Sequence, residues 1–149
     1  MKQWVVDTWV LEKCNDTDCY DCIDCIAFLT YLLRKGKLCL DHEEEIYEEY
    51  EDYIKPRTFL FQWWSKIVGE AGHICRWSNK LADKHEDRLI NKLGFHDDDI
   101  KFVGVAARSV DKLLVSGDSD YNETIRDYLN SKLGITVLKP LAAIGEISV

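Results

Sequence analysis

Residues 112–122, KLLVSGDSDYN, constrain the fold more than any other segment of the chain. The apolar run at 113–115 contains no polar residue, which is typical of a strand buried on both faces of a parallel sheet. A Ser-Gly pair ends the run, and Asp118 and Asp120 follow it. Because open α/β sheets bind their ligands just beyond the carboxyl ends of the strands, these two carboxylates are candidates for a functional site.

The first residues of the chain repeat this pattern. Residues 4–6 are apolar and are followed by Asp7 and Thr8, which predicts a second short strand that ends in a carboxylate. Two strands that deliver acidic side chains to one edge of a sheet are a more specific signal than either strand alone.

The remaining pattern alternates helices with strands. A helix at 22–35 ends at a basic turn and a glycine, and a strand at 38–40 completes a βαβ unit with the first strand. We expect further helices at 42–54, 58–71, 74–92 and 121–133, a helix capped by 97–99, and a last strand at 135–138. This alternation predicts an α/β fold with a parallel sheet, in one domain of 149 residues.

The formal net charge of −8 argues against a surface that attracts nucleic acid as a whole, because an anionic field slows the approach of a polyanion unless a local basic surface overrides it. No apolar run approaches the ~20 residues needed to span a bilayer. Asp7 interrupts the short apolar run after Lys2, so we also expect no secretion signal. The expected location is cytoplasmic, without a membrane partner.

Two further acidic residues are expected near the same edge of the sheet. Asp99 opens the helix that precedes the strand at 113–115, and Glu49 shares a helix face with Ile46, which turns it toward the protein. At about 4 Å and an effective dielectric near 20, each carboxylate pair repels by about 4 kcal/mol. Such a cluster requires protons or a divalent cation. Mg²⁺ and Mn²⁺ prefer oxygen ligands, which points to metal-assisted phosphodiester hydrolysis.

Five motifs, in this order, resemble the PIN-domain family: VVDT at 5–8, I-x-x-EY at 46–50, D-x-x-FV-x-x-A at 99–106, LLVSGDSD at 113–120 and LGITVLKP at 133–140. The resemblance covers nearly the whole chain, as a single PIN-like domain at 1–149. It implies a three-layer fold with a parallel sheet of about five strands, in the order 3-2-1-4-5, flanked by helices. It also implies a divalent-metal-dependent endoribonuclease with RNA as its substrate. Many members are toxins of toxin–antitoxin pairs, which implies an antitoxin protein as a partner.

Carried over by position, the resemblance implies that acidic side chains hold Mg²⁺ or Mn²⁺, with the hydroxyl of Ser116 near the site. The implied metal ligands are Asp7, Glu49, Asp99, Asp118 and, as an additional ligand, Asp120. In this interpretation the cations lower the pKa of a bound water and stabilise the pentavalent phosphate. The chain departs from the family pattern at Trp9, which replaces a small polar residue. The triplet at 97–99 offers three acids, of which Asp99 fits the spacing of its motif.

Simpler interpretations of the same residues stay open. Aspartates commonly occupy turns and helix N-caps, and Glu49 lies among other glutamates, as on a solvated helix face. The alternative function is a catalytically silent PIN-like module that binds RNA or protein.

The segment at about 57–93 is aromatic and basic, and we expect it to be helical. Trp63 and Trp64 lie in an apolar stretch that covers most of a helix circumference, which predicts deep burial or a homodimer contact. Basic residues at every fourth position of the helix expected at 74–92 either bind RNA phosphates or are neutralised by neighbouring acids. This basic ladder comprises Arg76, Lys80, Lys84, Arg88 and Lys92.

Four of the six cysteines are close together in the sequence: Cys14, Cys19, Cys22 and Cys25. They allow three interpretations. In the first, Cys19, Cys22 and Cys25 are small apolar groups on one helix face. In the second, these three residues ligate zinc or an iron–sulfur cluster, with Cys14 as a fourth ligand. In the third, they form disulfides in a thermophile.

Overall fold

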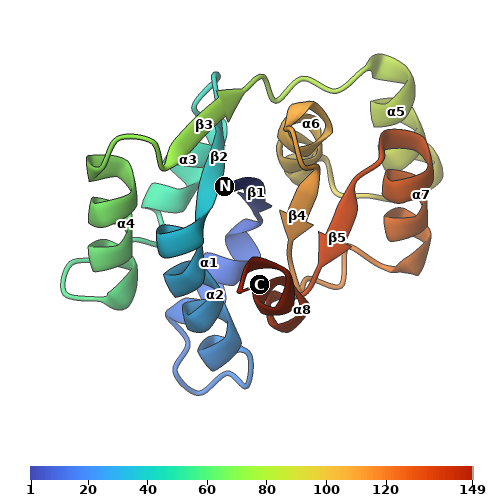
Figure 1. The fold of residues 1–149 in the computed structure, drawn as a ribbon. Helices are drawn as coiled ribbons and strands as arrows, with labels where there is room; N and C mark the ends of the chain where they lie inside the picture. Colours follow the sequence, from blue (N-terminus) through green and yellow to red (C-terminus); the bar gives the residue numbers. More distant parts are fainter. Residues whose placement is uncertain (149) are drawn as a thin grey trace.

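Parallel strands form one sheet at the centre of the molecule, with the strand order β3-β2-β1-β4-β5. The computed structural model of the protein describes residues 1–148. The strands are β1 (Lys2–Val6), β2 (Gly36–Asp41), β3 (Ile74–Trp77), β4 (Leu113–Val115) and β5 (Thr136–Leu138), and Figure 1 shows β1 between β2 and β4. The α/β class and the strand order expected from the sequence are confirmed.

The two strands that precede the acidic motifs are neighbours in register. Trp4 pairs with Leu113 and Val6 pairs with Val115, and the side chains of residues 4–6 are fully buried. The ladder continues one residue further, because the Asp7 amide donates to the Val115 carbonyl at 3.0 Å. Asp7 and Ser116 therefore leave the sheet side by side, at the same edge.

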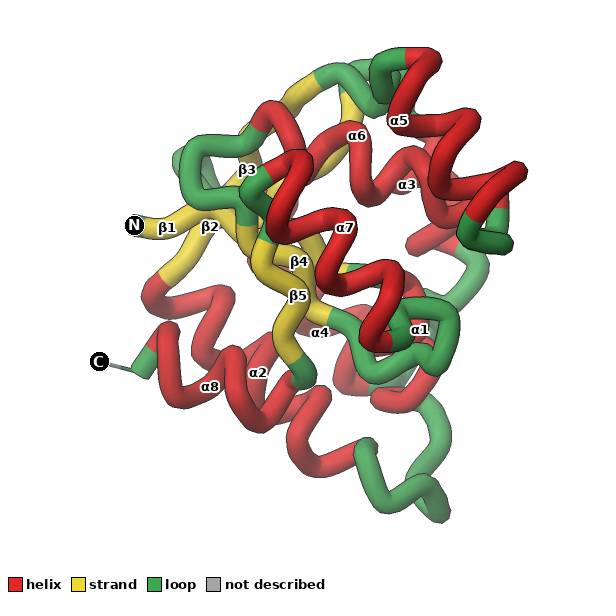
Figure 2. The backbone as a smooth tube through the Cα atoms, turned by 90° about the vertical axis from the view of Figure 1, so that its right-hand side faces the viewer, coloured by secondary structure: helices red, strands yellow, loops and turns green. Residues whose placement is uncertain are grey.

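Helices cover both faces of this sheet, which gives three layers (Figure 2). On one face α2 (Cys22–Lys35) packs against α4 (Phe59–Gly69) and α8 (Pro140–Ile147). On the other face α6 (Ile100–Arg108) lies across the middle of the sheet, with α3 (Glu45–Glu51) on the β2 side and α7 (Glu123–Leu133) on β5. The remaining helices are α1 (Thr8–Cys14), directly after β1, and α5 (Asp83–Asp87).

The prediction of one helix at 74–92 is wrong. Residues Ile74–Trp77 form edge strand β3, which pairs in parallel with β2, and only Asp83–Asp87 and a π-helical turn at Arg88–Lys92 are helical. A run of four residues is too short for its periodicity to distinguish strand from helix, and the partner strand β2 decides the outcome. The basic ladder is consequently dispersed over a strand, a loop and two helical segments, and its residues form no stripe.

Trp63 and Trp64 belong to the core of the chain. They are 2% and 8% exposed, and the Trp63 indole nitrogen donates to the Leu29 carbonyl at 2.9 Å. The large apolar side chains that α4 leaves exposed are Phe61 and Val68. Burial in the core explains why two large apolar side chains occur at positions 63 and 64. The homodimer contact stays a prediction.

No helix within residues 1–148 combines the length and the apolar character required to cross a bilayer.

Candidate functional site

All the acidic residues expected at the site line one cavity of about 360 Å³ at the carboxyl edge of the sheet. These acids are Asp7, Glu49, Asp99, Asp118 and Asp120. They come from the end of β1, from α3, from the start of α6 and from the loop after β4, so segments far apart in the sequence converge. The structure thus brings the predicted set together.

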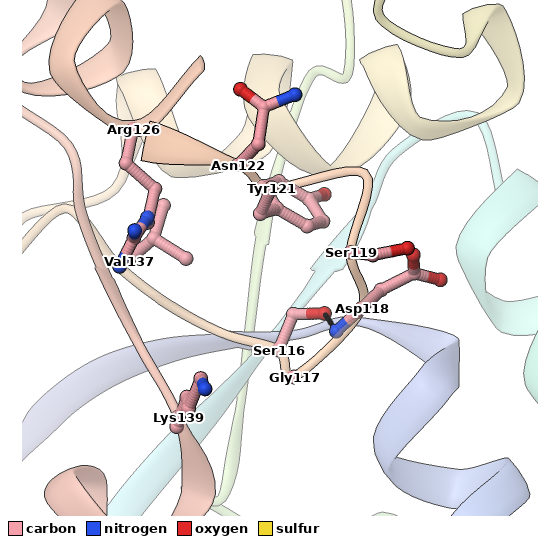
Figure 3. Close-up of a pocket in the computed structure, with 9 residues that line it drawn as sticks. All are labelled: Ser116, Gly117, Asp118, Ser119, Tyr121, Asn122, Arg126, Val137 and Lys139. Carbon is pink, nitrogen blue, oxygen red and sulfur yellow. Dashed lines mark hydrogen bonds between the residues drawn. The ribbon is translucent and has the colours of Figure 1, made fainter. Parts of the chain in front are cut away.

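Asp7 is the most deeply buried member, with 3% of its surface exposed. The hydroxyl of Ser116 donates a hydrogen bond to its Oδ2 at 2.6 Å, and the same Oγ accepts from the Asp118 amide at 3.0 Å (Figure 3). Burial raises the pKa of Asp7 to about 7; the Ser116 hydrogen bond opposes this rise, and the charges of Asp99, Asp118 and Glu49 add to it. Ser116, predicted near the site, therefore links the two acids across neighbouring strands.

Glu49 is held by two side chains from different elements. The hydroxyl of Thr8 donates to its Oε2, and the ammonium of Lys101 lies 2.9 Å from its Oε1. Lys101 also donates to the backbone carbonyl of Asp98 at 2.6 Å. Glu49 therefore faces the protein, as its helix position predicted, and already has a cationic neighbour.

The position of helix α3, which carries Glu49, is fixed by another buried acid. The carboxylate of Asp41, at the end of β2, accepts from the amide of Glu45 at 2.9 Å and from that of Ile46 at 3.1 Å. It also accepts from the side-chain amide of Asn79 at 2.8 Å. Asp41 is fully buried, and these bonds occupy both of its oxygens, so it serves as a helix anchor and lies outside the acidic cavity.

Asp99 begins α6 and is the half-buried member of the triplet at 97–99. Burial raises its pKa to about 6, and the charges of Asp120, Asp118 and Glu49 add to this rise, while His96 opposes it. Asp98 also lines the cavity but is exposed. His96, Asp97 and Asp98 form an exposed group whose potential ligand atoms lie within 4.8 Å of one another.

The loop after β4 carries the last two acids. The amide of Asp120 donates to Asp118 Oδ1 at 2.9 Å, and the amide of Tyr121 donates to the Asp118 carbonyl at 3.1 Å. This tight turn directs both carboxylates into the cavity. Asp120 is the more exposed of the two.

Lys101 and Tyr121 were missed by the sequence analysis. The hydroxyl of Tyr121 is buried and has no hydrogen-bond partner among the described residues. Burial raises its pKa well above the usual value, and the charges of Asp7, Asp99 and Asp118 add to the effect. The side chain therefore lies close to the acids. In the sequence, only the position of Tyr121 directly after Asp118 and Asp120 pointed to a place near the site. Nothing in the sequence pointed to Lys101.

Trp9 forms one wall of the acidic cavity. A Cβ atom on Gly117 would lie 2.3 Å from the indole Cη2 of Trp9. Glycine at this position therefore allows the indole to lie against the loop after β4. The bulk of Trp9 is thus accommodated by the glycine that precedes Asp118.

The cavity has the chemistry of a site for a hard cation. Several carboxylates line one small volume, and among the described residues their mutual repulsion is offset by protonation, by Lys101 beside Glu49 and by His96 near Asp99. Carboxylate oxygens are the ligands that Mg²⁺ and Mn²⁺ prefer. The chemistry of these side chains suits a divalent ion, but within residues 1–148 no three of the cavity acids bring oxygens within 4.8 Å of one another. Asp7, Asp99, Asp118 and Asp120 are the acids that have no cationic side chain within salt-bridge distance among the described residues.

The cysteines lie elsewhere and are all free thiols. Cys14, Cys22 and Cys25 are buried, and Cys19 is half-buried in the turn before α2. Within residues 1–148, the exposed group at 96–98 is the only one that brings three or more potential ligand atoms within 4.8 Å of one another. The first of the three interpretations, small groups packed in the core, describes the buried cysteines.

Comparison of the chain with protein-family models, with curated proteins and with solved structures finds no match.

Proposed function

We propose that the protein is a PIN-like endoribonuclease that uses Mg²⁺ or Mn²⁺ to hydrolyse RNA phosphodiester bonds. The observation that carries this proposal is the convergence of acids from separate segments on one cavity at the edge of the sheet. From β1, the strands β2 and β3 extend the sheet on one side, and β4 and β5 extend it on the other. The direction in which successive strands are added therefore reverses between β1 and β4. Open α/β sheets bind their ligands at such a reversal, and Asp7 and Asp118 follow these two strands.

In this function Asp7, Asp99, Asp118 and Asp120 would hold the divalent ion, with Glu49 at the side of the site. The bound ion would stabilise negative charge on the phosphate and lower the pKa of a bound water. Ser116 fixes the orientation of Asp7 through its hydrogen bond, and Thr8 and Lys101 fix that of Glu49. With a pKa of about 7, Asp7 can hold a proton in the metal-free protein at neutral pH and release it when a cation binds.

The direct test is cleavage of single-stranded RNA in EDTA, Mg²⁺ and Mn²⁺. We expect cleavage with either ion and none in EDTA. Asp118→Asn is expected to lower kcat about 10³-fold, because a misplaced cation forfeits about 4 kcal/mol of transition-state stabilisation. Asp127→Asn, which changes an exposed acid on α7, is the matched control and should cleave like the parent. Cleavage at the parent rate by Asp118→Asn would refute the assignment.

Lys101 predicts how tightly the cavity binds a cation. Its ammonium already lies 2.9 Å from Glu49 and would repel a divalent ion held by the remaining acids. Lys101→Met is expected to tighten Mn²⁺ binding about fivefold, because it removes a repulsion of about 1 kcal/mol. Calorimetric titration measures the affinity, with Lys92→Met as the control. Unchanged or weaker binding in Lys101→Met would contradict this account.

The Lys101–Glu49 ion pair also favours a second candidate function. A resident cation reduces the need for a metal ion, as in a PIN-like module that binds RNA or protein without cleavage. A calorimetric titration of the parent that shows no heat with Mg²⁺ or Mn²⁺ would favour this module. The toxin role depends on a partner protein. A gene for a small antitoxin next to the gene for this chain would support that role. Without such a gene, an RNA-processing role remains.

A further inference from the structure

A second cavity, of about 280 Å³, adjoins the acidic one. It lies between the loop after β4, the start of α7 and the end of β5, and Asp118 lines both cavities. Figure 3 shows Arg126 and Lys139 on one side of this loop, with Ser119 and Asp118 on the other. The shared aspartate places the second cavity directly beside the proposed site of hydrolysis.

Arg126 and Lys139 give this cavity a positive character. Both side chains are exposed, and neither forms a salt bridge with another residue of the described chain. Lys101, in contrast, is engaged by Glu49. In a chain with a net charge of −8, the lining of this cavity holds two cations and one acid, Asp118. A local basic surface of this kind offsets the repulsion that the whole molecule exerts on a polyanion.

The remaining polar side chains of the cavity are directed elsewhere. Asn122 uses its side-chain oxygen to accept from the Ile125 amide at 3.0 Å, and Figure 3 shows its side chain directed away from Lys139. Tyr121 also lines the cavity, but its side chain is 5% exposed, and in Figure 3 the hydroxyl end of its ring is directed toward the Asp118 side. Arg126 and Lys139 are therefore the groups of this cavity that match an anion.

We propose that this cavity binds the RNA phosphate next to the one that is cleaved. This inference rests on the proposed function and adds a phosphate-binding position to it. A guanidinium and an ammonium are the side chains suited to a phosphate group. Arg126 and Lys139 are the phosphate-binding residues.

The test measures binding separately from cleavage. A short fluorescein-labelled oligouridylate is titrated with the inactive Asp7→Asn protein, with and without Arg126→Ala/Lys139→Ala, and anisotropy is recorded over a range of salt concentrations. The double replacement is expected to weaken binding about tenfold to a hundredfold, since two charge-assisted hydrogen-bond donors are lost. The slope of log K against log salt should become shallower by about 0.7, for one phosphate contact. Lys132→Ala, in the last turn of α7, is the matched control and should change neither quantity.

In the active protein the same double replacement is expected to raise KM more than it lowers kcat, because the lost contacts bind substrate and transition state alike. Unchanged affinity and salt slope in the double variant would overturn this inference and leave the proposed nuclease intact. A parent that cleaves no RNA but loses single-strand binding on the double replacement would refute the nuclease and support the phosphate site.

Discussion

The Asp7→Asn variant is expected to be inactive toward RNA and yet more stable than the parent above about pH 7. Asp7 is 3% exposed and lies among other acids. The folded protein retains a proton on it up to about pH 7, whereas the unfolded chain releases that proton near 3.8. Ionising Asp7 in the folded state therefore costs free energy, on the order of 4 kcal/mol for this difference in pKa. The asparagine removes that cost and keeps an oxygen that can accept from Ser116.

The sign of the pH dependence follows from the same pKa shift. Between about pH 4 and 7 the folded state binds more protons than the unfolded state, so the metal-free parent loses stability as the pH rises. Asp99, with a pKa raised to about 6, contributes in the same direction. Urea unfolding of the metal-free proteins should give Asp7→Asn an advantage of about 2 to 4 kcal/mol at about pH 8 and little advantage at about pH 4.

Added Mn²⁺ should reverse this order, because an ion that binds only the folded state stabilises it. The parent should gain stability with Mn²⁺ at about pH 8, and Asp7→Asn should gain much less. An asparagine variant that is less stable than the parent at every pH, or that gains as much from Mn²⁺, would contradict the proposal that Asp7 is a buried acid with a raised pKa that binds the metal.

Gly104→Ala is expected to be the most destabilising single-methyl change in the chain. A Cβ atom at this position of α6 would lie 2.0 Å from the backbone carbonyl oxygen of Asn79. Neither backbone can yield easily, and overpacking of this kind costs about 3 kcal/mol of unfolding free energy. Thermal and urea unfolding measure the loss.

The matched control is Gly145→Ala in α8, where no atom lies within 4 Å of the added Cβ. This change should stabilise the protein by about 0.5 kcal/mol, because alanine is the better helix former. The contact between Gly104 and Asn79 is also connected to the acidic cavity. Asn79 donates to Asp41, and Asp41 holds the start of the helix that carries Glu49. A Gly104→Ala protein as stable as the parent would show that this contact is looser than the structure describes.

The acids of the site could be predicted because each has a local signal. Asp7 and Asp118 follow short apolar strands, and parallel strands that are neighbours end at one edge. Glu49 shares a helix face with buried Ile46, and Asp99 opens a helix. The prediction therefore needed only periodicity, strand ends and a family resemblance.

The parts that could not be predicted depend on neighbours that are distant in the sequence. β3 is a strand because β2 pairs with it, and its four residues carry no decisive pattern of their own. Asp41 also follows an apolar strand, and its bonds to the amides of Glu45 and Ile46 are those of a local helix cap. Only its bond to Asn79 comes from a residue distant in the sequence. Lys101 reaches Glu49 through the packing of α6 against α3, which no local pattern encodes.

The position of β1 in the middle of the sheet has a consequence for the time at which the acidic cavity can form during synthesis. β1 is made before β4, and Ser116, which holds Asp7 in place, follows that residue by 109 positions. At about 5–20 residues per second on the ribosome, the nascent chain carries an incomplete acidic cavity for roughly 5 to 20 s after β1 is made. The cavity can be completed only once β4 and the loop after it have been synthesised.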